Sequence, residues 1–232
     1  MMHRVYSALR WLAFQALPLR CLVCGDPGAD ALDLCLACHA ELPWNDHACL
    51  LCALPLLEGE PAGICGKCVA TPPRQQAAAA TFLYTAPIDQ LLIRFKFHQD
   101  LAAGRLLSQL MLQRVPPWLD APLVPLPLHT RRLRERGYDQ ALELTRPLAK
   151  EMCLPLWRGL VRTRVTAAQS ELDAERRQRN LRGAFAAIAR PPDALILVDD
   201  VMTTGATLDA ALHALEQAGL LHAFLWVCAR TP

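Results

Sequence analysis

The chain has 232 residues, of which 53% are hydrophobic and 20% charged, and its formal net charge is +2. This composition excludes an intrinsically disordered chain, and the length allows one large domain or one ordinary domain plus a small one. The small net charge hides an asymmetry, because residues 131–182 carry thirteen Lys and Arg against seven Asp and Glu. Such a basic segment indicates an anionic ligand or a nucleic acid, or else a solvated helix face.

Residues 1–18 predict an amphipathic helix that packs on the protein, because apolar side chains recur there near helical spacing. The apolar stretch is short, Gln15 interrupts it, and no small-residue cleavage site follows, so we do not expect a secretory signal. We also expect no membrane span, since no apolar run has the required length. These features favour a cytoplasmic protein.

Eight of the ten cysteines form four Cys-x-x-Cys pairs, and we expect a small zinc-ribbon domain over residues 19–72. The pairs are Cys21/Cys24, Cys35/Cys38, Cys49/Cys52 and Cys65/Cys68. In a cytosolic chain this pattern favours metal over disulfides or redox chemistry, because one tight turn presents two thiolates to the same ion. Eight ligands predict two structural Zn²⁺ ions, without which so short a segment would not fold. The pairs could combine sequentially, as in a double zinc ribbon, or interleaved, and the spacing permits both.

After a proline-containing linker, an α/β domain is expected over residues 73–232. Strand patterns alternate with helical patterns along it. The strands are expected at 81–86, 121–128, 154–157, 195–201 and 222–228, and the helices at 88–97, 102–115, 137–152 and 208–219. This alternation predicts a mostly parallel sheet with flanking helices, and such sheets bind ligands at the carboxyl ends of their strands. Cys153 and Cys228 lie in apolar stretches of this domain and are expected to be buried.

The stretch "LILVDDVMTTGATL" at 195–208 ends a buried strand with Asp199 and Asp200. The turn that follows offers hydroxyls, backbone N–H groups and the positive end of a helix, which together suit an anion. Gly205 lets the main chain approach that anion closely. The carboxylates would repel a phosphate, but they suit vicinal sugar hydroxyls or a divalent cation. The stretch therefore predicts a ribose 5-phosphate site, and its simpler alternative is a capped helix start.

The segment "LILVDDVMTTGAT" resembles the phosphoribosyl pyrophosphate (PRPP) motif of type I phosphoribosyltransferases. The cysteine pairs, "LIRFKF", "VPLPLHTRRLRERGYDQA" and "RTRVTAAQSELDAERRQRNLRGAF" extend the resemblance to the ComF family (ComFC and GntX-like proteins) over nearly the whole chain. This resemblance implies a type I phosphoribosyltransferase-like parallel sheet preceded by a double zinc ribbon. It also implies that Asp199 and Asp200 bind the ribose hydroxyls and Mg²⁺. The residues implied to hold the 5-phosphate are Thr203, Thr204, Gly205, Ala206 and Thr207.

The same resemblance implies a pyrophosphate loop at residues 128–130 and an active-site lid at residues 163–180. Polar candidates in and around these segments are Lys96, Arg134, Arg136, Gln169, Arg176 and Arg179, each of which could instead be solvated or ion-paired. Gly137, Tyr138, Asp139 and Gln140 are expected to begin the helix behind the pyrophosphate loop. The candidate catalytic residues are Asp199, Asp200, Arg136 and Gln169.

Three functions follow from these features, and they can coexist. The first is Mg²⁺-dependent phosphoribosyl transfer to an acceptor that the sequence does not identify, since no residue stands out as its general base. The second is a PRPP or nucleotide sensor without turnover. The third is an accessory protein that binds single-stranded DNA or a helicase-like partner during DNA uptake (competence) or the use of external DNA.

Overall fold

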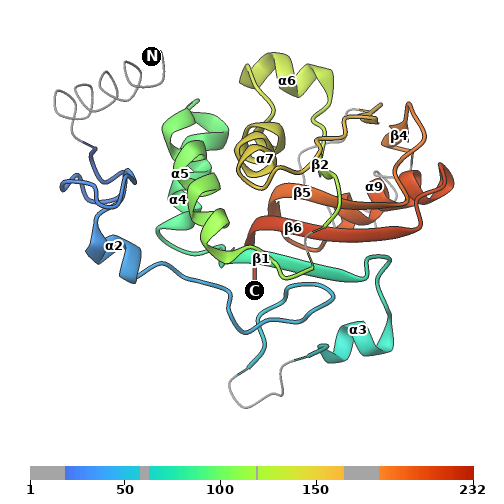
Figure 1. The fold of residues 1–232 in the computed structure, drawn as a ribbon, viewed down its shortest axis with the longest axis horizontal. Coiled ribbons are helices and arrows are strands. Elements are labelled where there is room, and N and C mark those ends of the chain that lie inside the picture. The colour runs from blue at the N-terminus through green and yellow to red at the C-terminus, as the bar shows by residue number, and fades with distance from the viewer. Residues whose placement is uncertain (1–18, 58–62, 119, 165–182) are drawn as a thin grey trace. The chain divides into compact units, whose positions relative to one another are not determined.

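The computed structural model describes residues 19–57, 63–118, 120–164 and 183–232 (Figure 1). The chain divides into two compact units, residues 1–42 and residues 43–232. The helix expected at 1–18 lies outside the described residues. The second unit contains the cysteines from Cys49 onward together with the whole parallel sheet. The three-part division at residues 18/19 and 72/73 stays a prediction.

The described part of the first unit is built around two tight turns. The first turn closes through the N–H of Gly25, which donates to the Cys21 carbonyl at 2.9 Å, and Gly25 has a φ of 87° that suits glycine. The second turn leads into the short helix α2 (Leu36–Ala40), whose N-terminal cap is Cys35. Leu34 is buried between these turns, so a few apolar contacts and the turn geometry organise the segment.

A four-stranded sheet in the order β1-β6-β5-β2 forms the centre of the second unit, and all its strands are parallel. The strands are β1 (Ala77–Leu83), β2 (Leu123–Pro125), β5 (Ala194–Met202) and β6 (His222–Arg230). Asp199 pairs with Val227, and Met202 pairs with Arg230. The predicted parallel sheet with flanking helices is confirmed, and the carboxyl ends of its strands meet at one edge.

Helices pack on both faces of this sheet, as the alternation of buried residues along β5 requires. Leu195 and Leu197 share a core cluster with α9 (Ala206–Gln217). On the opposite face α4 (Ile88–Phe97), α5 (Leu101–Met111) and α7 (Gln140–Glu151) pack against one another, with α5 and α7 also contacting the sheet. Leu208, Ala211, Leu212 and Leu215 form the apolar face of α9, and all four are buried.

The second cysteine segment belongs to the fold of the sheet unit. The Ala78 N–H donates to the Leu50 carbonyl at 2.8 Å, and the Gln75 side chain donates to the Leu51 carbonyl at 2.6 Å. Ala53 is 1% exposed and belongs to the same core cluster as α9. The segment ends in α3 (Gly66–Ala70). These contacts tie the cysteine turns to the first strand of the sheet and to its core.

The structure corrects two expectations about this unit and adds one element that was not expected. The strand expected at 154–157 is only a single bridge between Leu156 and Leu123, where Pro155 removes a backbone donor. An unexpected two-stranded antiparallel ribbon, β3 (Leu160–Arg162) with β4 (Phe185–Ala187), flanks residues 165–182. Cys228 is buried as expected, but Cys153 is exposed, because it occupies a turn after α7 with a φ of 54°.

Candidate functional site

The eight paired cysteines form two groups of four, each with its sulfur atoms within 4.8 Å of one another. Cys21, Cys24, Cys35 and Cys38 form the first group, and Cys49, Cys52, Cys65 and Cys68 form the second. The pairs therefore combine sequentially, and not in the interleaved order that the spacing also allowed. His39 and His47 are in neither group.

The sulfur geometry fits zinc. A tetrahedral ion with Zn–S bonds of about 2.3 Å places its sulfur ligands about 3.8 Å apart. The Sγ atoms of Cys24 and Cys35 lie 3.6 Å apart, and those of Cys52 and Cys65 lie 3.7 Å apart. The Cys65 N–H also donates to the Cys49 sulfur at 3.3 Å, as expected for a thiolate that ligates a metal. Both groups thus have the donor set of a closed structural zinc site.

Within each group of four cysteines, the pKa of one thiol is lowered and that of another is raised. Burial alone would raise the pKa of Cys21, but hydrogen bonds from backbone N–H groups lower it to about 6. The same balance lowers the pKa of Cys49 to about 7. Burial raises the pKa of Cys38 and of Cys68, so these thiols resist ionisation. A divalent cation shifts such a group toward four thiolates.

Two adjacent carboxylates occupy the carboxyl end of β5. Asp200 is 8% exposed, and its Oδ2 lies 2.9 Å from the Nζ of Lys96 on α4. Each carboxylate also accepts a backbone N–H, since Asp199 Oδ1 receives that of Asp200 at 2.9 Å and Asp200 Oδ1 that of Val201 at 2.6 Å. Burial alone would lower the pKa of Lys96, but the charge of Asp200 raises it. The ammonium of Lys96 therefore compensates part of the negative charge at this position.

The surroundings of Asp199 oppose the ionisation of its carboxyl group. Burial and then the charge of Asp200 raise the pKa of Asp199 well above that of a solvated carboxyl, although Lys96 opposes the change. Neighbouring Asp139 also has a raised pKa, because of burial first and, among the charges, Asp200. The charges of Asp199, Asp200 and Asp139 thus act on one another, and a bound cation would reduce their repulsion.

The raised pKa of Asp199 makes the free energy of unfolding depend on pH. Because folding raises the pKa of Asp199, the native protein binds that proton more tightly than the unfolded chain does. The wild type should therefore lose free energy of unfolding as the pH rises from the ordinary carboxyl range through the raised pKa. Asp199→Asn removes this loss, so its stability relative to the wild type should increase across the same window. Urea unfolding at a series of pH values without added Mg²⁺ measures the difference.

The exposed residue Asp193 provides the control for this experiment. Asp193→Asn should leave the pH dependence of the unfolding free energy unchanged. A difference between Asp199→Asn and the wild type that is the same at every pH would contradict the raised pKa.

The loop after β5 leads directly into the amino end of α9. Thr203 and Thr204 are exposed, and Thr204 Oγ1 accepts the Ala206 N–H at 3.4 Å. Gly205 has a φ of 79°, which few other residues adopt without strain, and caps α9. Thr207 lies in the first turn of α9 and is half-buried. The five residues expected to hold a phosphate are therefore contiguous at the amino end of a 12-residue helix.

Asp139 organises the neighbouring loop after β2. Its Oδ2 accepts the Leu128 N–H at 2.9 Å, while its Oδ1 accepts the Leu142 N–H at 3.0 Å and so caps α7. Between them lies the short helix α6 (Thr130–Arg136), which ends at Gly137 with a φ of 83°. The helix expected from residue 137 begins instead at Gln140 with Asp139 as its cap, because Gly137 ends the unexpected helix α6. The loop expected to hold pyrophosphate is fixed to the helix behind it.

The candidate arginines differ in their surroundings. Arg136 donates to Gln140 Oε1 at 3.0 Å, and its guanidinium lies 5.3 Å from the centre of the Phe97 ring. Arg134 on the same helix is exposed. Gln169, Arg176 and Arg179 lie outside the described residues, so their positions in the site stay a prediction.

Two further arginines, absent from the candidates, interact electrostatically with this region: Arg162 with Asp199, and Arg132 with both Arg162 and Arg136. Burial and then the charge of Arg132 lower the pKa of Arg162, whereas Asp199 acts in the opposite direction. Burial and the charge of Arg136 likewise lower the pKa of Arg132. The mutual repulsion of these cations favours an anion between α6 and β3. No local pattern indicates Arg162, because β3 reaches the site only through the tertiary fold.

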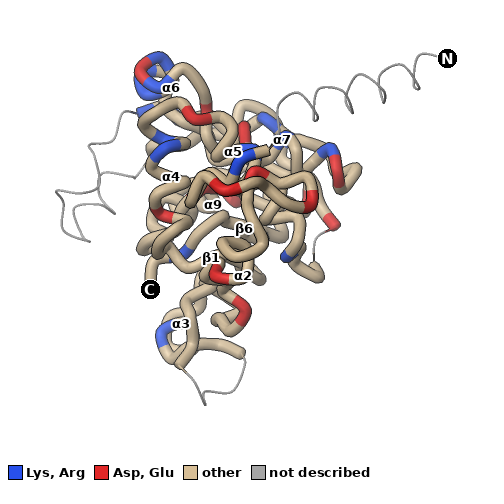
Figure 2. Tube along the Cα trace, turned by 90° about the vertical axis from the view of Figure 1, so that its left-hand side faces the viewer, with Lys and Arg blue, Asp and Glu red and all other residues tan. Residues whose placement is uncertain are grey.

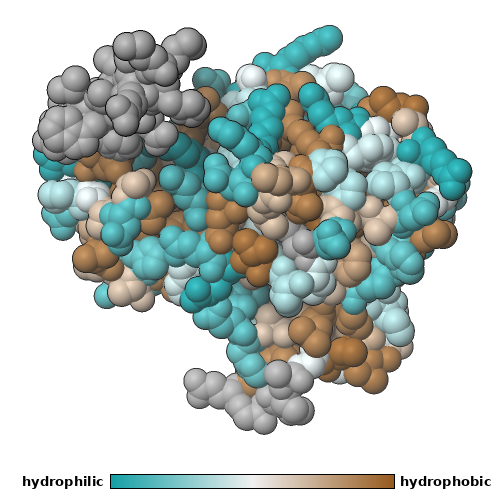
Figure 3. Space-filling model, viewed as in Figure 1, coloured by the Kyte–Doolittle hydropathy of each residue, from teal (hydrophilic) through white to brown (hydrophobic). Residues whose placement is uncertain are grey.

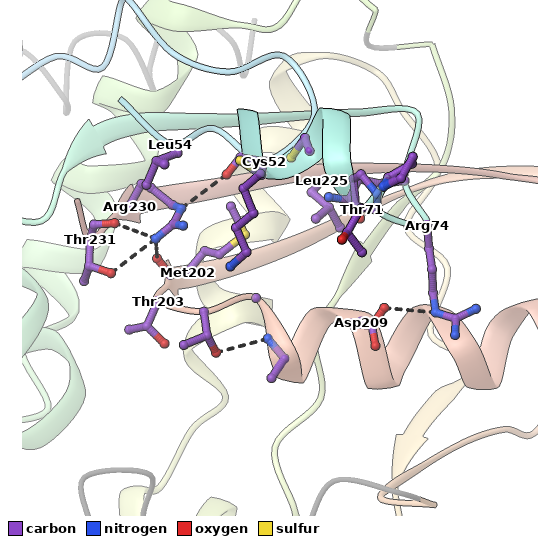
Figure 4. Close-up of a pocket in the computed structure, with 18 of the residues that line it drawn as sticks. Cys52, Leu54, Thr71, Arg74, Met202, Thr203, Asp209, Leu225, Arg230 and Thr231 are labelled. Atoms are coloured by element: carbon purple, nitrogen blue, oxygen red, sulfur yellow. Dashed lines mark hydrogen bonds and ion pairs between the residues drawn. The ribbon is translucent and has the colours of Figure 1, made fainter. Parts of the chain in front are cut away.

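A cavity of about 1000 Å³ adjoins the loop after β5 (Figure 4). This loop, residues 203–206, is called the Thr-Gly loop below. Thr203 and its three following residues line one side, and Cys52, Leu54, Lys67 and Cys68 line another. Arg230, Thr231 and Pro232 at the end of β6 contribute to the lining. The second cysteine group and the Thr-Gly loop therefore open onto one shared cavity.

These features define an α/β protein with a parallel sheet and a double zinc ribbon, and a family model for the double zinc ribbon domain matches residues 13–69. The DNA utilization protein YhgH of Salmonella typhi is 32% identical over 226 residues, which are 93% of this chain and 98% of that protein. Competence protein F of Haemophilus influenzae is 32% identical over 178 residues, 72% of this chain and 78% of that protein. Competence protein ComFC of Streptococcus pneumoniae is 26% identical over 140 residues, 60% of this chain and 62% of that protein. The chain belongs to the ComF family.

None of the helices in the described part of the chain is both long enough and apolar enough to cross a bilayer.

Proposed function

We propose that this protein binds PRPP, or a related ribose 5-phosphate, together with Mg²⁺ at the carboxyl edge of its sheet. One observation carries the proposal: the carboxylates of Asp199 and Asp200 lie near the end of β5, and the loop that follows β5 caps the 12-residue helix α9. Backbone N–H groups and hydroxyls of the loop suit the 5-phosphate, and the carboxylates suit the ribose hydroxyls and a cation. A capped helix start would require neither the second carboxylate nor the left-handed Gly205.

Mg²⁺ fits this donor set, since it prefers oxygen ligands and is usually shared between carboxylates and substrate phosphates. When bound, it would supply positive charge that stabilises a departing pyrophosphate. The chain's own contribution would be to orient the ribose through Asp199 and Asp200 and to surround the pyrophosphate with guanidinium groups. Arg134 and Arg136 are the candidates from the sequence, and Arg132 and Arg162 are added because of their surroundings in the structure.

Transfer of the phosphoribosyl group is the activity that such a site would support. The test is pyrophosphate release with PRPP, Mg²⁺ and a panel of nucleobases and nucleosides. Release in the presence of one acceptor would make the protein a phosphoribosyltransferase. Binding of PRPP without release across the panel would make it a sensor, and the proposed site would be the same in both cases.

A role in DNA uptake or in the use of external DNA is our proposal for the biological process, because the relatives are named for competence and DNA utilization. One surface favours direct contact with single-stranded DNA. Helix α6 carries four arginines in seven residues (Figure 2), and its surroundings are largely hydrophilic (Figure 3). Beside it, Phe97 is 65% exposed under the guanidinium of Arg136. Cations next to an exposed ring suit the phosphate backbone and a stacked base of single-stranded DNA. If this surface binds DNA, the affinity should fall steeply as the salt concentration rises.

Glycine substitutions test the phosphate loop itself. Gly205→Ala introduces strain at a φ of 79°, and the added Cβ would meet nothing closer than the Met202 sulfur at 3.7 Å. The cost of about 1–2 kcal/mol should displace the loop from its anion-binding conformation. We expect the affinity for PRPP with Mg²⁺, measured by calorimetry, to fall at least about tenfold, which corresponds to about 1.4 kcal/mol.

Gly219→Ala is the matched control, because Gly219 has a φ of 103° with nothing within 4 Å of an added Cβ. It lies after the far end of α9, so it should lower stability similarly and leave PRPP affinity unchanged. Equal PRPP affinities for the two variants would contradict the assignment of the loop.

A further inference from the structure

The cavity beside the Thr-Gly loop has a wall that comes from the second cysteine group (Figure 4). Cys52, Lys67 and Cys68 line this wall, and Thr203 and Thr204 line the loop side. The cysteine segment thus does more than stabilise a separate ribbon, because it encloses the space in front of the proposed phosphate loop.

Hydrogen bonds hold this wall against the sheet. Arg230 is 8% exposed, and its Nε donates to the Cys52 carbonyl at 3.2 Å. Its Nη1 donates to the Met202 carbonyl at 3.2 Å, directly before the Thr-Gly loop. On the other side of the cavity, Arg74 pairs with Asp209 at 2.9 Å and with Glu216 at 2.5 Å, both on α9. Arg230 therefore links the cysteine segment to the residue before the phosphate loop, and Arg74 fixes the stretch after the cysteine segment to α9.

Of the three cations that line the cavity in the described part of the chain, Lys67 is the one available to a ligand. Arg74 is occupied by two carboxylates, and Arg230 donates to carbonyl groups of the cavity wall. Within the described ranges, Lys67 has no ion-pair partner, and its side chain is exposed on α3. It lies between Cys65 and Cys68, so the turn that gathers these sulfurs also fixes its backbone.

We propose that Lys67 binds the phosphate monoester held by the Thr-Gly loop, so that the second zinc ribbon supplies part of the sugar-phosphate site. This inference rests on the proposed function. A helix N-terminus neutralises a phosphate dianion only partly, and an ammonium group across the cavity adds a charge-assisted contact. Removing one such contact should weaken binding about 10- to 100-fold.

Titration of ribose 5-phosphate with Mg²⁺ into the full-length, zinc-loaded protein tests this contact. Lys67→Met should bind about 10- to 100-fold more weakly than the wild type. Lys67→Arg should retain most of the affinity, because it retains the charge. The control Lys150→Met alters an exposed lysine of α7 that does not line the cavity, and it should bind like the wild type. Zinc content, measured on each variant, should be unchanged.

The outcomes separate the two proposals. Wild-type protein that binds neither ribose 5-phosphate nor PRPP would overturn the proposed function and this inference together. Tight binding by the wild type and equally tight binding by Lys67→Met would overturn the role of Lys67 alone.

A second measurement needs no variant. Lysine occurs only at positions 67, 96 and 150 of the chain, so acetylation of each can be followed by mass spectrometry. Ribose 5-phosphate with Mg²⁺ should slow the acetylation of Lys67 severalfold and leave that of Lys150 unchanged. Acetylation of Lys67 at the same rate with and without ribose 5-phosphate would overturn the proposal.

Discussion

Replacement of Cys65 by serine is expected to remove one zinc ion and to unfold the compact unit that contains the parallel sheet. Cys65 is one of four sulfurs in the second group, and that segment shares its core with the sheet through Ala53. Zinc contributes about 10–16 kcal/mol to the folding of small zinc domains, and the net stability of a protein is only about 5–15 kcal/mol. The lost ligand should therefore cost the unit most of its stability.

Metal analysis and thermal unfolding measure this effect together. The control Cys153→Ser changes an exposed cysteine that belongs to neither group and should keep both zinc ions and the wild-type melting temperature. Cys24→Ser removes a ligand of the first group, which lies in the other compact unit. It should lose one zinc while the unfolding of the sheet unit changes much less. A Cys65→Ser protein with a wild-type melting temperature would contradict the structural role of the second zinc.

The second large effect is expected at the paired carboxylates. Asp199→Asn/Asp200→Asn keeps the shape of both side chains and removes the negative charge that would hold Mg²⁺ and the ribose hydroxyls. Because uncharged amides are poor ligands for a hard cation, PRPP affinity in the presence of Mg²⁺ should fall at least about 100-fold, or about 2.7 kcal/mol. The variant also leaves Lys96 without its carboxylate partner, which is 2.9 Å away in the native protein.

Equilibrium dialysis with labelled PRPP measures this loss, and circular dichroism of the unliganded variant establishes that it is folded. The exposed residue Asp120 offers a control, since Asp120→Asn changes the net charge without altering the site. Affinity of the double variant within about threefold of the wild type, a difference under about 0.7 kcal/mol, would mean that the carboxylates do not hold the ligand.

Local sequence pattern was sufficient for the parts of this fold that have a strong periodicity. The run at 195–201 gave β5, and the apolar spacing from Leu208 to Leu215 gave the buried face of α9. The strand predicted from the apolar run at 154–157 was wrong, because only Leu156 pairs with the sheet, at a single bridge, and Pro155 has no N–H group to extend the pairing. The ribbon of β3 and β4 was missed, since three-residue strands carry too little pattern to be recognised.

The candidate site was predictable where its residues are neighbours in the sequence. Asp199, Asp200 and the following loop form one motif, and the cysteine pairs form another. The order in which the pairs combine depends on the path of the chain between them, so only the structure distinguished sequential from interleaved groups. The sequential order follows the shorter connections, as in a double zinc ribbon.

Contacts between distant segments account for what the sequence did not reveal. Arg230 bonds the Cys52 carbonyl across 178 positions, and its own surroundings in the sequence are those of an ordinary buried strand. From the sequence, Lys67 is expected to be an ordinary surface residue of a zinc-binding turn. In the structure it lines the same cavity as the Thr-Gly loop. Asp139 is recognisable as a helix cap, but its bond to the Leu128 N–H joins two loops.

The central claim is that the carboxyl edge of the sheet is a ribose-phosphate site that works with a divalent cation. Calorimetric titration of PRPP into the zinc-loaded wild type, with and without Mg²⁺, tests it most directly. We expect saturable binding near one equivalent per chain with Mg²⁺ and much weaker binding without it. Absence of binding to a folded protein that contains both zinc ions would contradict the claim and would leave the arginine-rich surface of α6 as the functional site to pursue.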